Sequence, residues 1–167
     1  MKIYIFSGIA AGLLCLGCQA EDRAPVAAKA EGKAMNLSST RLVEHKSGEW
    51  SPGLTEEEKG TLFAIARDTL NWSVGGQREK FLLDKYALTP RLKGKCATFV
   101  TFTNRKELRG CVGTLEAREP MYQSVHTSAV NASQDSRFGD NPITTNEVPA
   151  IQIHVSLLSQ MKPIQSI

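Results

Sequence analysis

Apolar side chains recur every three or four residues between Thr55 and Gly75, which is the spacing of an amphipathic helix. Thr55 and Glu58 have the form of a capping box, in which each side chain accepts a hydrogen bond from the other residue's backbone amide. The pattern therefore predicts a helix over residues 56–72, closed by glycines at 75 and 76. The positions of its predicted buried stripe are Leu62, Ile65, Ala66, Thr69 and Leu70.

Two runs of β-branched and aromatic residues, separated by a polar turn, predict a β-hairpin. The first run covers residues 97–102 and the second covers residues 108–115. A turn centred near Arg105 would place Cys111 opposite Phe99 on the neighbouring strand.

A second helix is predicted to begin after Pro120, because proline is well tolerated in the first turn of a helix. A turn-rich segment follows at residues 135–142. Apolar and polar residues then alternate strictly from Ile151 to Leu157, which indicates a half-buried strand. Helix, hairpin, helix and strand without a regular βαβ rhythm predict an α+β fold, with helices packed on a mainly antiparallel sheet. The predicted buried face of the second helix is Met121, Val125, Ser128, Ala129 and Ala132.

Residues 1–18 have the form of a lipoprotein-type signal peptide. The apolar stretch from residue 3 to residue 16 is too short to span a membrane comfortably and suits the core of an export signal. It ends in a lipobox-like sequence before Cys18, although Cys15 stands where that motif usually has leucine. A lipidated Cys18 would make the chain a membrane-anchored lipoprotein of the cell envelope. The alternatives are cleavage after Ala20, which gives a secreted or periplasmic protein, and no export signal.

Residues 19–50 are rich in alanine, lysine, glutamate and serine, which predicts a flexible linker. The folded domain is then expected over residues 51–167. With 41% hydrophobic and 22% charged residues, the composition is that of a globular protein. The formal charge is only +3 and there is no dense basic run, so general nucleic-acid binding is disfavoured.

Cys96 and Cys111 are the two of the four cysteines that would remain in the folded domain. In the predicted hairpin Cys96 lies opposite Thr114, three residues along the strand from Cys111. That offset is roughly 10 Å at the rise of a strand, which is more than a disulfide can bridge. We therefore predict two free thiols.

The sequence around Cys111 is the strongest candidate for a functional site. Gly110 and Gly113 weaken a strand unless they serve a bulge or a close backbone approach. Arg109 should share a face with Cys111, and its guanidinium could bind a carboxylate or phosphate or favour the thiolate. Three interpretations stay open: a structural bulge with a buried thiol, a ligand site at Arg109, Gly110 and Gly113, or Cys111 as a nucleophile.

His126 is a candidate general base for Cys111 if its helix packs near the hairpin, and His154 is a weaker one. Asp135 and Arg137 are predicted to form an ion pair that fixes the turn, although Arg137 is also a candidate ligand-binding residue. The chain has no phosphate-binding glycine loop, no Cys-x-x-Cys and no common hydrolase or metalloprotease motif. Because the cysteine and histidine spacing matches no standard zinc site, we predict neither metal nor cofactor.

Leu-Arg-Gly-Cys-Val-Gly at residues 108–113 resembles the hallmark Leu-Arg-Gly-Cys-Ile-Gly of the AMMECR-one domain family, and Asp-Ser-Arg-Phe at 135–138 is similar too. The resemblance covers about residues 55–167 and implies an α+β fold with two unequal lobes. Gly-Asp-Asn-Pro at 139–142 lengthens a loop in which the family usually has a proline pair. Family domains also continue beyond the strand at 151–157, so we expect an incomplete domain with an unpaired last strand.

In bacteria and archaea, proteins of this family are often called AmmeMemoRadiSam system protein A. The resemblance implies a Memo-type protein and a radical S-adenosylmethionine protein as partners. Our leading hypothesis is an accessory binding module of such a system. The alternative is an enzyme that uses Cys111 as nucleophile, assisted by His126, in a protein- or small-molecule-modifying reaction. A third interpretation makes the whole motif a folding device.

Overall fold

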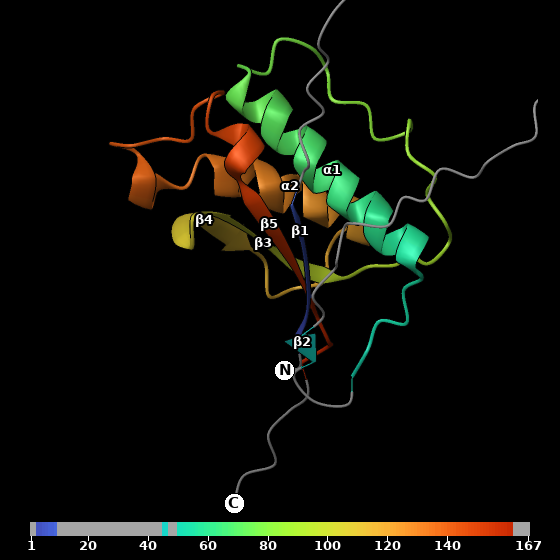
Figure 1. Ribbon diagram of the computed structural model, residues 1–167. Coiled ribbons are helices and arrows are strands. Elements are labelled where there is room, and N and C mark those ends of the chain that lie inside the picture. Colours follow the sequence, from blue (N-terminus) through green and yellow to red (C-terminus); the bar gives the residue numbers. More distant parts are fainter. Residues whose placement is uncertain (1–2, 10–44, 47–49, 162–167) are drawn as a thin grey trace, which may run out of the picture.

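An antiparallel sheet of five strands, in the order β2-β1-β5-β3-β4, carries two helices packed against one of its faces (Figure 1). The computed structural model describes residues 3–9, 45–46 and 50–161. This arrangement confirms the predicted α+β fold with a mainly antiparallel sheet. The elements are β1 (Ile3–Ile9), β2 (His45–Lys46), α1 (Glu56–Val74), β3 (Ala97–Asn104), β4 (Glu107–Gly113), α2 (Met121–Ser133) and β5 (Gln152–Leu158), with short 3-10 helices at Ser136–Phe138 and Val148–Ala150.

Helix α1 begins at the predicted capping box. The Glu58 backbone amide donates to Thr55 Oγ1 at 3.2 Å, and the Thr55 amide donates to Glu58 Oε2 at 3.0 Å. The helix ends at Val74, two residues beyond the predicted position, and Gly75 follows as its C-cap. All five positions of the predicted apolar stripe are buried, which places this stripe in the core.

The core fills the space between the two helices and the covered face of the sheet. The inward side chains of β5 alternate as predicted, with Ile153, Val155 and Leu157 fully buried. Val125 and Ala129 of α2 pack into the same cluster, so α2 lies with its apolar face toward the sheet. The polar side chains between the apolar positions of β5 therefore point to the other face of the sheet.

Strand β5 has a partner on each side, so the expectation of an unpaired last strand is wrong. It pairs with β3 on one side and along its whole length with β1 on the other. The segment Ile3–Ile9 is the apolar run that the sequence assigns to a signal peptide, and in this structure it forms a strand. The lipobox and Cys18 lie outside the described residues, so the export signal stays a prediction.

The β3–β4 hairpin differs in register from the sequence-based expectation. Cys111 lies opposite Thr101, not Phe99. The turn is tighter than predicted, because only Arg105 and Lys106 join the strands, with φ angles of +49° and +74°. Two residues with positive φ are characteristic of the type I′ turn, whose twist matches that of a hairpin. A register shift between Phe102 and Thr103 of β3 adds to the difference.

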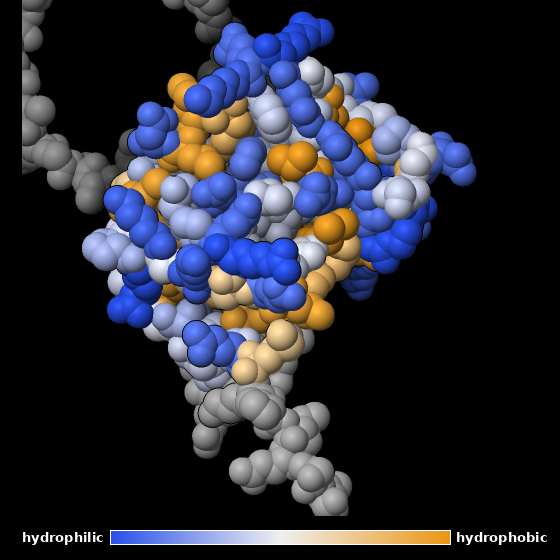
Figure 2. All heavy atoms as spheres, turned by 180° about the vertical axis from the view of Figure 1, so that it is seen from behind, coloured by the Kyte–Doolittle hydropathy of each residue, from blue (hydrophilic) through white to orange (hydrophobic). Residues whose placement is uncertain are grey.

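The described part of the chain contains no helix long and apolar enough to cross a membrane. On the side of the molecule drawn in Figure 2, hydrophobic residues are scattered among hydrophilic ones.

Candidate functional site

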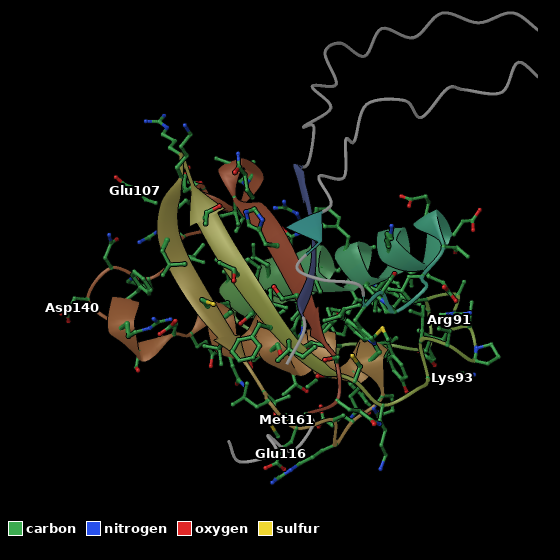
Figure 3. The ribbon with its side chains drawn as sticks, turned by 90° about the horizontal axis from the view of Figure 1, so that it is seen from below. Arg91, Lys93, Glu107, Glu116, Asp140 and Met161 are labelled. Carbon is green, nitrogen blue, oxygen red and sulfur yellow. The ribbon has the colours of Figure 1, made fainter. Side chains whose placement is uncertain are left out.

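The sheet face away from α1 and α2, here called the open face, carries the Cys111 side chain. Figure 3 views the strands in front of the helices from this side. Cys111 is paired with Thr101, and alternation along β3 places Thr101 opposite to the inward, fully buried Val100 and Phe102. The open-face side chains of the three strands β3, β4 and β5 are Ala97, Phe99, Thr101, Thr103, Leu108, Cys111, Gln152, His154, Ser156 and Leu158.

Cys111 lies in a row of polar side chains that crosses three strands. The Thr101 hydroxyl donates a hydrogen bond to Cys111 Sγ at 3.0 Å. Thr101 is in turn opposite His154 of β5. Thr101 was not predicted as a site residue, because only the true hairpin register shows which strand residue faces the thiol.

Arg109 occupies a β-bulge and does not share the open face with Cys111. Leu108 pairs with Thr103 and Gly110 with Phe102, so Arg109 is the extra residue of β4. The bulge breaks the alternation on which the shared-face prediction rested, so that prediction is wrong. The Arg109 side chain is only 9% exposed.

The Arg109 guanidinium is engaged by a carboxylate in a two-point contact. Its Nε donates to Glu147 Oε1 at 2.7 Å and its Nη2 to Glu147 Oε2 at 3.1 Å. Nη2 also donates to the Asn141 carbonyl at 3.0 Å. The hydrogen bond from Arg109, assisted by the amide of Asn104, holds the pKa of the Glu147 carboxyl below its usual value. Arg109 thus ties β4 to the segment before the second 3-10 helix. Glu147 was not predicted as the partner of Arg109, because nothing near it in the sequence indicates this contact over 38 residues.

Asp135 and Arg137 bind the backbone of Cys111 on the outer edge of β4, and we call this pair the edge cap. The Cys111 amide donates to Asp135 Oδ2 at 3.0 Å, and Arg137 Nη2 donates to the Cys111 carbonyl at 2.9 Å. Arg137 Nη2 and Asp135 Oδ2 are 2.6 Å apart, which confirms the predicted ion pair. The side chain of Arg137, followed by the Cys111 amide, holds the pKa of Asp135 well below its ordinary value. The edge cap thus stands where a further strand would pair.

The two glycines of the motif allow close backbone approaches. A Cβ atom on Gly110 would lie 1.9 Å from the Ala132 carbonyl oxygen of α2. A Cβ atom on Gly113 would lie 2.2 Å from the Thr98 carbonyl oxygen of β3. Both distances are far below van der Waals contact, so each position excludes a side chain. The close approach inferred from the sequence is confirmed at both positions.

His126 does not meet Cys111. It lies on α2 and faces α1, where its Nδ1 is 2.8 Å from the Thr69 hydroxyl. Its ring stacks on Phe81 with 4.4 Å between centroids, and burial lowers the pKa of His126. Because α2 covers one face of the sheet and Cys111 lies on the other, the structure does not assemble the predicted Cys111–His126 pair.

Both cysteines of the folded domain are free thiols, as predicted. Cys96 is buried directly before β3, and burial raises the pKa of its thiol. Within residues 3–9, 45–46 and 50–161, no group of three histidine, cysteine, aspartate or glutamate side chains is arranged to hold a metal ion.

The fold and site define a class of α+β domain. Its edge strand carries a bulge and an edge cap, and two of its glycines allow close contact with neighbouring backbone. The sequence matches AMMECR1 over residues 63–167, and the chain belongs to this family. The resemblance of residues 108–113 and 135–138 to the AMMECR-one domain family is thereby confirmed.

Archaeal proteins are similar to this chain in sequence. Protein SSO0193 of Saccharolobus solfataricus is 35% identical over 121 residues, which cover 67% of this chain and 49% of the relative. A protein of Methanothermobacter thermautotrophicus is 29% identical over 113 residues, which cover 67% of this chain and 57% of that protein. The chain thus spans about half the length of these curated relatives.

The fold is also similar to a solved structure. The crystal structure of the uncharacterized protein PH0010 from Pyrococcus horikoshii aligns with a TM-score of 0.55 and 23% identity. The alignment covers 63% of this chain and 53% of that protein. At this identity the likeness concerns the fold alone.

Proposed function

We propose that this chain is an accessory binding module of an AmmeMemoRadiSam-type system, and that the open face around Cys111 is its recognition surface. One observation carries the proposal. Two groups of the signature motif are already occupied within the domain: Arg109 contacts Glu147, and the edge cap binds the Cys111 backbone. The side chains of Cys111 and the exposed Leu108 are what the motif offers to a partner.

The open face is suited to binding a preformed partner surface. Its side chains include hydroxyl, amide and imidazole groups, and Phe99 and Leu108 add apolar area. Leu108 is 39% exposed, so its apolar side chain is accessible to a partner. Side chains on hydrogen-bonded strands are held more firmly than side chains on loops, which favours recognition with little rearrangement.

The Memo-type protein is the partner that we propose. Family resemblance implies both a Memo-type and a radical S-adenosylmethionine protein. The radical protein needs reduced iron–sulfur chemistry, which is hard to reconcile with an exported chain. A Memo-type protein carries no such conflict with the predicted location.

Leu108→Glu is expected to weaken binding of the Memo-type protein of the same cells by at least about tenfold, because it places a charge within the proposed interface. Titration calorimetry with the purified pair measures the effect. Leu82→Glu is the matched control: Leu82 is also exposed, at 53%, but lies outside the open face. If both variants bind like the wild type, the open face is not the recognition surface.

A second candidate function is supported by the contact between Thr101 and Cys111. The Thr101 hydroxyl donates to Cys111 Sγ at 3.0 Å and so holds the sulfur in one orientation on the open face, as a nucleophile requires. His154, opposite Thr101, supplies a basic side chain in the same row. We therefore propose, as the alternative, an enzyme that uses Cys111 as nucleophile, with His154 instead of His126 as its assisting histidine.

Thr101→Val is expected to slow alkylation of Cys111 by iodoacetamide at neutral pH by about tenfold, because a hydrogen bond to a charged group contributes about 1.5 kcal/mol. Peptide mass spectrometry of Cys111 follows the rate. Thr103→Val, two residues along the same face, should leave the rate unchanged. Equal rates in all three proteins would contradict the nucleophile and leave Cys111 as part of the binding surface alone.

We also propose that the chain is exported and anchored in the cell envelope through a lipidated Cys18. The lipobox-like sequence before Cys18 supports this proposal. Cys18→Ser is expected to move the protein from the membrane to the soluble fraction, with loss of the lipid mass in its intact mass spectrum. A wild-type protein that is soluble and begins after Ala20 would instead support simple secretion. A soluble protein that still begins at Met1 would contradict export altogether.

A further inference from the structure

A hollow of about 630 Å³ lies at the end of the sheet where β3 begins and β5 ends. Neither Cys111 nor Leu108 lines it, so it has no part in the recognition surface proposed above. Its walls come from these strand ends, from the start of α2 and from the segment before α1. Three of the lining side chains carry sulfur: Cys96, Met121 and Met161.

Most of the sulfur in the described residues is collected at this hollow. Residues 3–9, 45–46 and 50–161 contain four sulfur-bearing side chains, and all except Cys111 line it. The three come from separate parts of the chain: directly before β3, at the first residue of α2, and after the end of β5. Because they lie far apart in the sequence, their spacing did not indicate a metal site.

The chain that leads into α2 brings Met121 next to Cys96. The Cys96 amide donates to the Glu119 carbonyl at 3.3 Å, and the Met121 amide donates to the Gly94 carbonyl at 2.8 Å. Met121 is therefore two residues along from the residue opposite Cys96, a diagonal position that is within reach of a long side chain. Cys96 and Met121 are each only 6% exposed and belong to the same buried cluster.

The chain after β5 brings Met161 to the hollow from the other side of Cys96. Ala97 pairs with Leu158, and Cys96 Sγ is 3.7 Å from the Leu158 carbonyl oxygen. Met161 follows three residues later and is 60% exposed, so its flexible, unbranched side chain can turn toward the thiol. Figure 3 shows Met161 at the margin of the molecule beside Glu116, which also lines the hollow. The thiol thus has one buried and one accessible thioether as neighbours.

Sulfur ligands favour soft metal ions. Cysteine thiolate and methionine thioether are ligands of Cu(I), whereas Mg²⁺ and Ca²⁺ are bound by oxygen. One thiolate and two neutral thioethers carry a single negative charge, which a monovalent ion cancels. A divalent ion would leave a positive charge beside apolar walls and the exposed Lys95, and burial of an uncompensated charge is costly. The three side chains therefore suit Cu(I) better than Zn²⁺.

We propose that Cys96, Met121 and Met161 together bind one Cu(I) ion. A bond forms between Cys96 Sγ and the ion, the thiol proton passes to solvent, and each thioether sulfur donates a lone pair. Copper remains Cu(I) throughout, so no oxidant or reductant is needed. The proposal is separate from the accessory role, because none of the three side chains belongs to the open face.

The test is an NMR titration of the full chain labelled with ¹³C at its methionine methyl groups, with Ag(I) as a redox-stable substitute for Cu(I). Cys15→Ser and Cys18→Ser remove the two thiols outside the folded domain. One equivalent of Ag(I) should shift the methyl signals of Met121 and Met161 and leave that of Met35 unchanged. Methionine-to-leucine variants assign the signals. An unchanged signal from Met121 or from Met161, or an equal shift at Met35, would overturn the proposal.

Competition with a chromophoric Cu(I) chelator, without oxygen, measures the affinity of the same chain. Met161→Leu changes an exposed position and should weaken Cu(I) binding by at least about tenfold, with unchanged thermal unfolding of the metal-free protein. Cys96→Ser should weaken binding further, because it removes the charged ligand. Cys111→Ser is the matched control and should bind like its parent. Unchanged affinity of the Met161→Leu protein, or equal losses in the two serine variants, would contradict the proposed site.

Discussion

Gly110→Ala is expected to lower the free energy of unfolding by about 3 kcal/mol, the upper end of what overpacking in a well-packed interior usually costs. The added methyl group would lie 1.9 Å from the Ala132 carbonyl oxygen, and the neighbouring atom is backbone that cannot rotate away. Strand β4 and helix α2 would have to separate to admit it. Urea denaturation followed by circular dichroism measures the loss.

Gly60→Ala is the control for this substitution. Gly60 lies within α1, and an added Cβ atom there meets nothing within 4 Å. Alanine at that helical position should raise the free energy of unfolding by about 0.5–1 kcal/mol. The two substitutions add the same methyl group and differ in the sign of their effect. A Gly110→Ala protein as stable as the wild type would show that β4 and α2 are not in backbone contact.

Arg109→Ala is expected to lower the free energy of unfolding by about 3–5 kcal/mol, because it leaves a largely buried carboxylate without its cation. The Glu147 side chain is 17% exposed and would lose both contacts of its ion pair. Arg118→Ala is the matched control. The Arg118 side chain is 77% exposed, and its pair with Glu116 should contribute less than about 1 kcal/mol.

The Arg109–Glu147 pair should also give the wild type a recognisable pH dependence. The pKa of Glu147 is lower in the folded than in the unfolded protein, because Arg109 stabilises the carboxylate. The contribution of the ion pair to the free energy of unfolding is therefore complete above the unfolded pKa of about 4.3, and it is lost as the pH falls through the pKa of the folded protein. Arg109→Ala should remove most of this acid-sensitive contribution to the stability. A variant with wild-type stability at pH 7 would rule out a structural role for the pair.

Local patterns predicted much of the fold correctly. The α1 start follows from Thr55 and Glu58, whose reciprocal hydrogen bonds span three residues. The inward face of β5 follows from strict alternation, which the burial of Ile153 and Val155 bears out. The glycines of the motif also signalled a close backbone approach. Each of these features is decided by residues near one another in the sequence.

The hairpin register was beyond the reach of local patterns. Arg105 and Lys106 adopt positive φ angles without glycine or asparagine, so the turn carries no sequence signature of its type. The bulge at Arg109 is stabilised by Glu147, 38 residues away. Because one extra residue changes the facing of every side chain beyond it, this contact decides whether Arg109 and Cys111 share a face.

The first apolar run shows a different limit of prediction from sequence, because one pattern fits two kinds of structure. Ile3–Ile9 is apolar and β-branched in composition, a pattern that suits both an export signal and a buried strand. The pairing of this run with β5 depends on a partner almost 150 residues away. His126 is a similar case, since periodicity placed it on a helix but could not choose between facing α1 and facing the hairpin.

The edge cap makes the segments at residues 108–113 and 135–137 depend on each other structurally. Asp135 and Arg137 complete the backbone hydrogen bonding of Cys111 across 24 and 26 residues of sequence. Substitutions in the two motifs should therefore be strongly non-additive in a double-mutant cycle. For protein engineering, the hairpin cannot be grafted onto another scaffold by itself: without the Asp-x-Arg segment, the graft would carry a bare sheet edge and invite self-association.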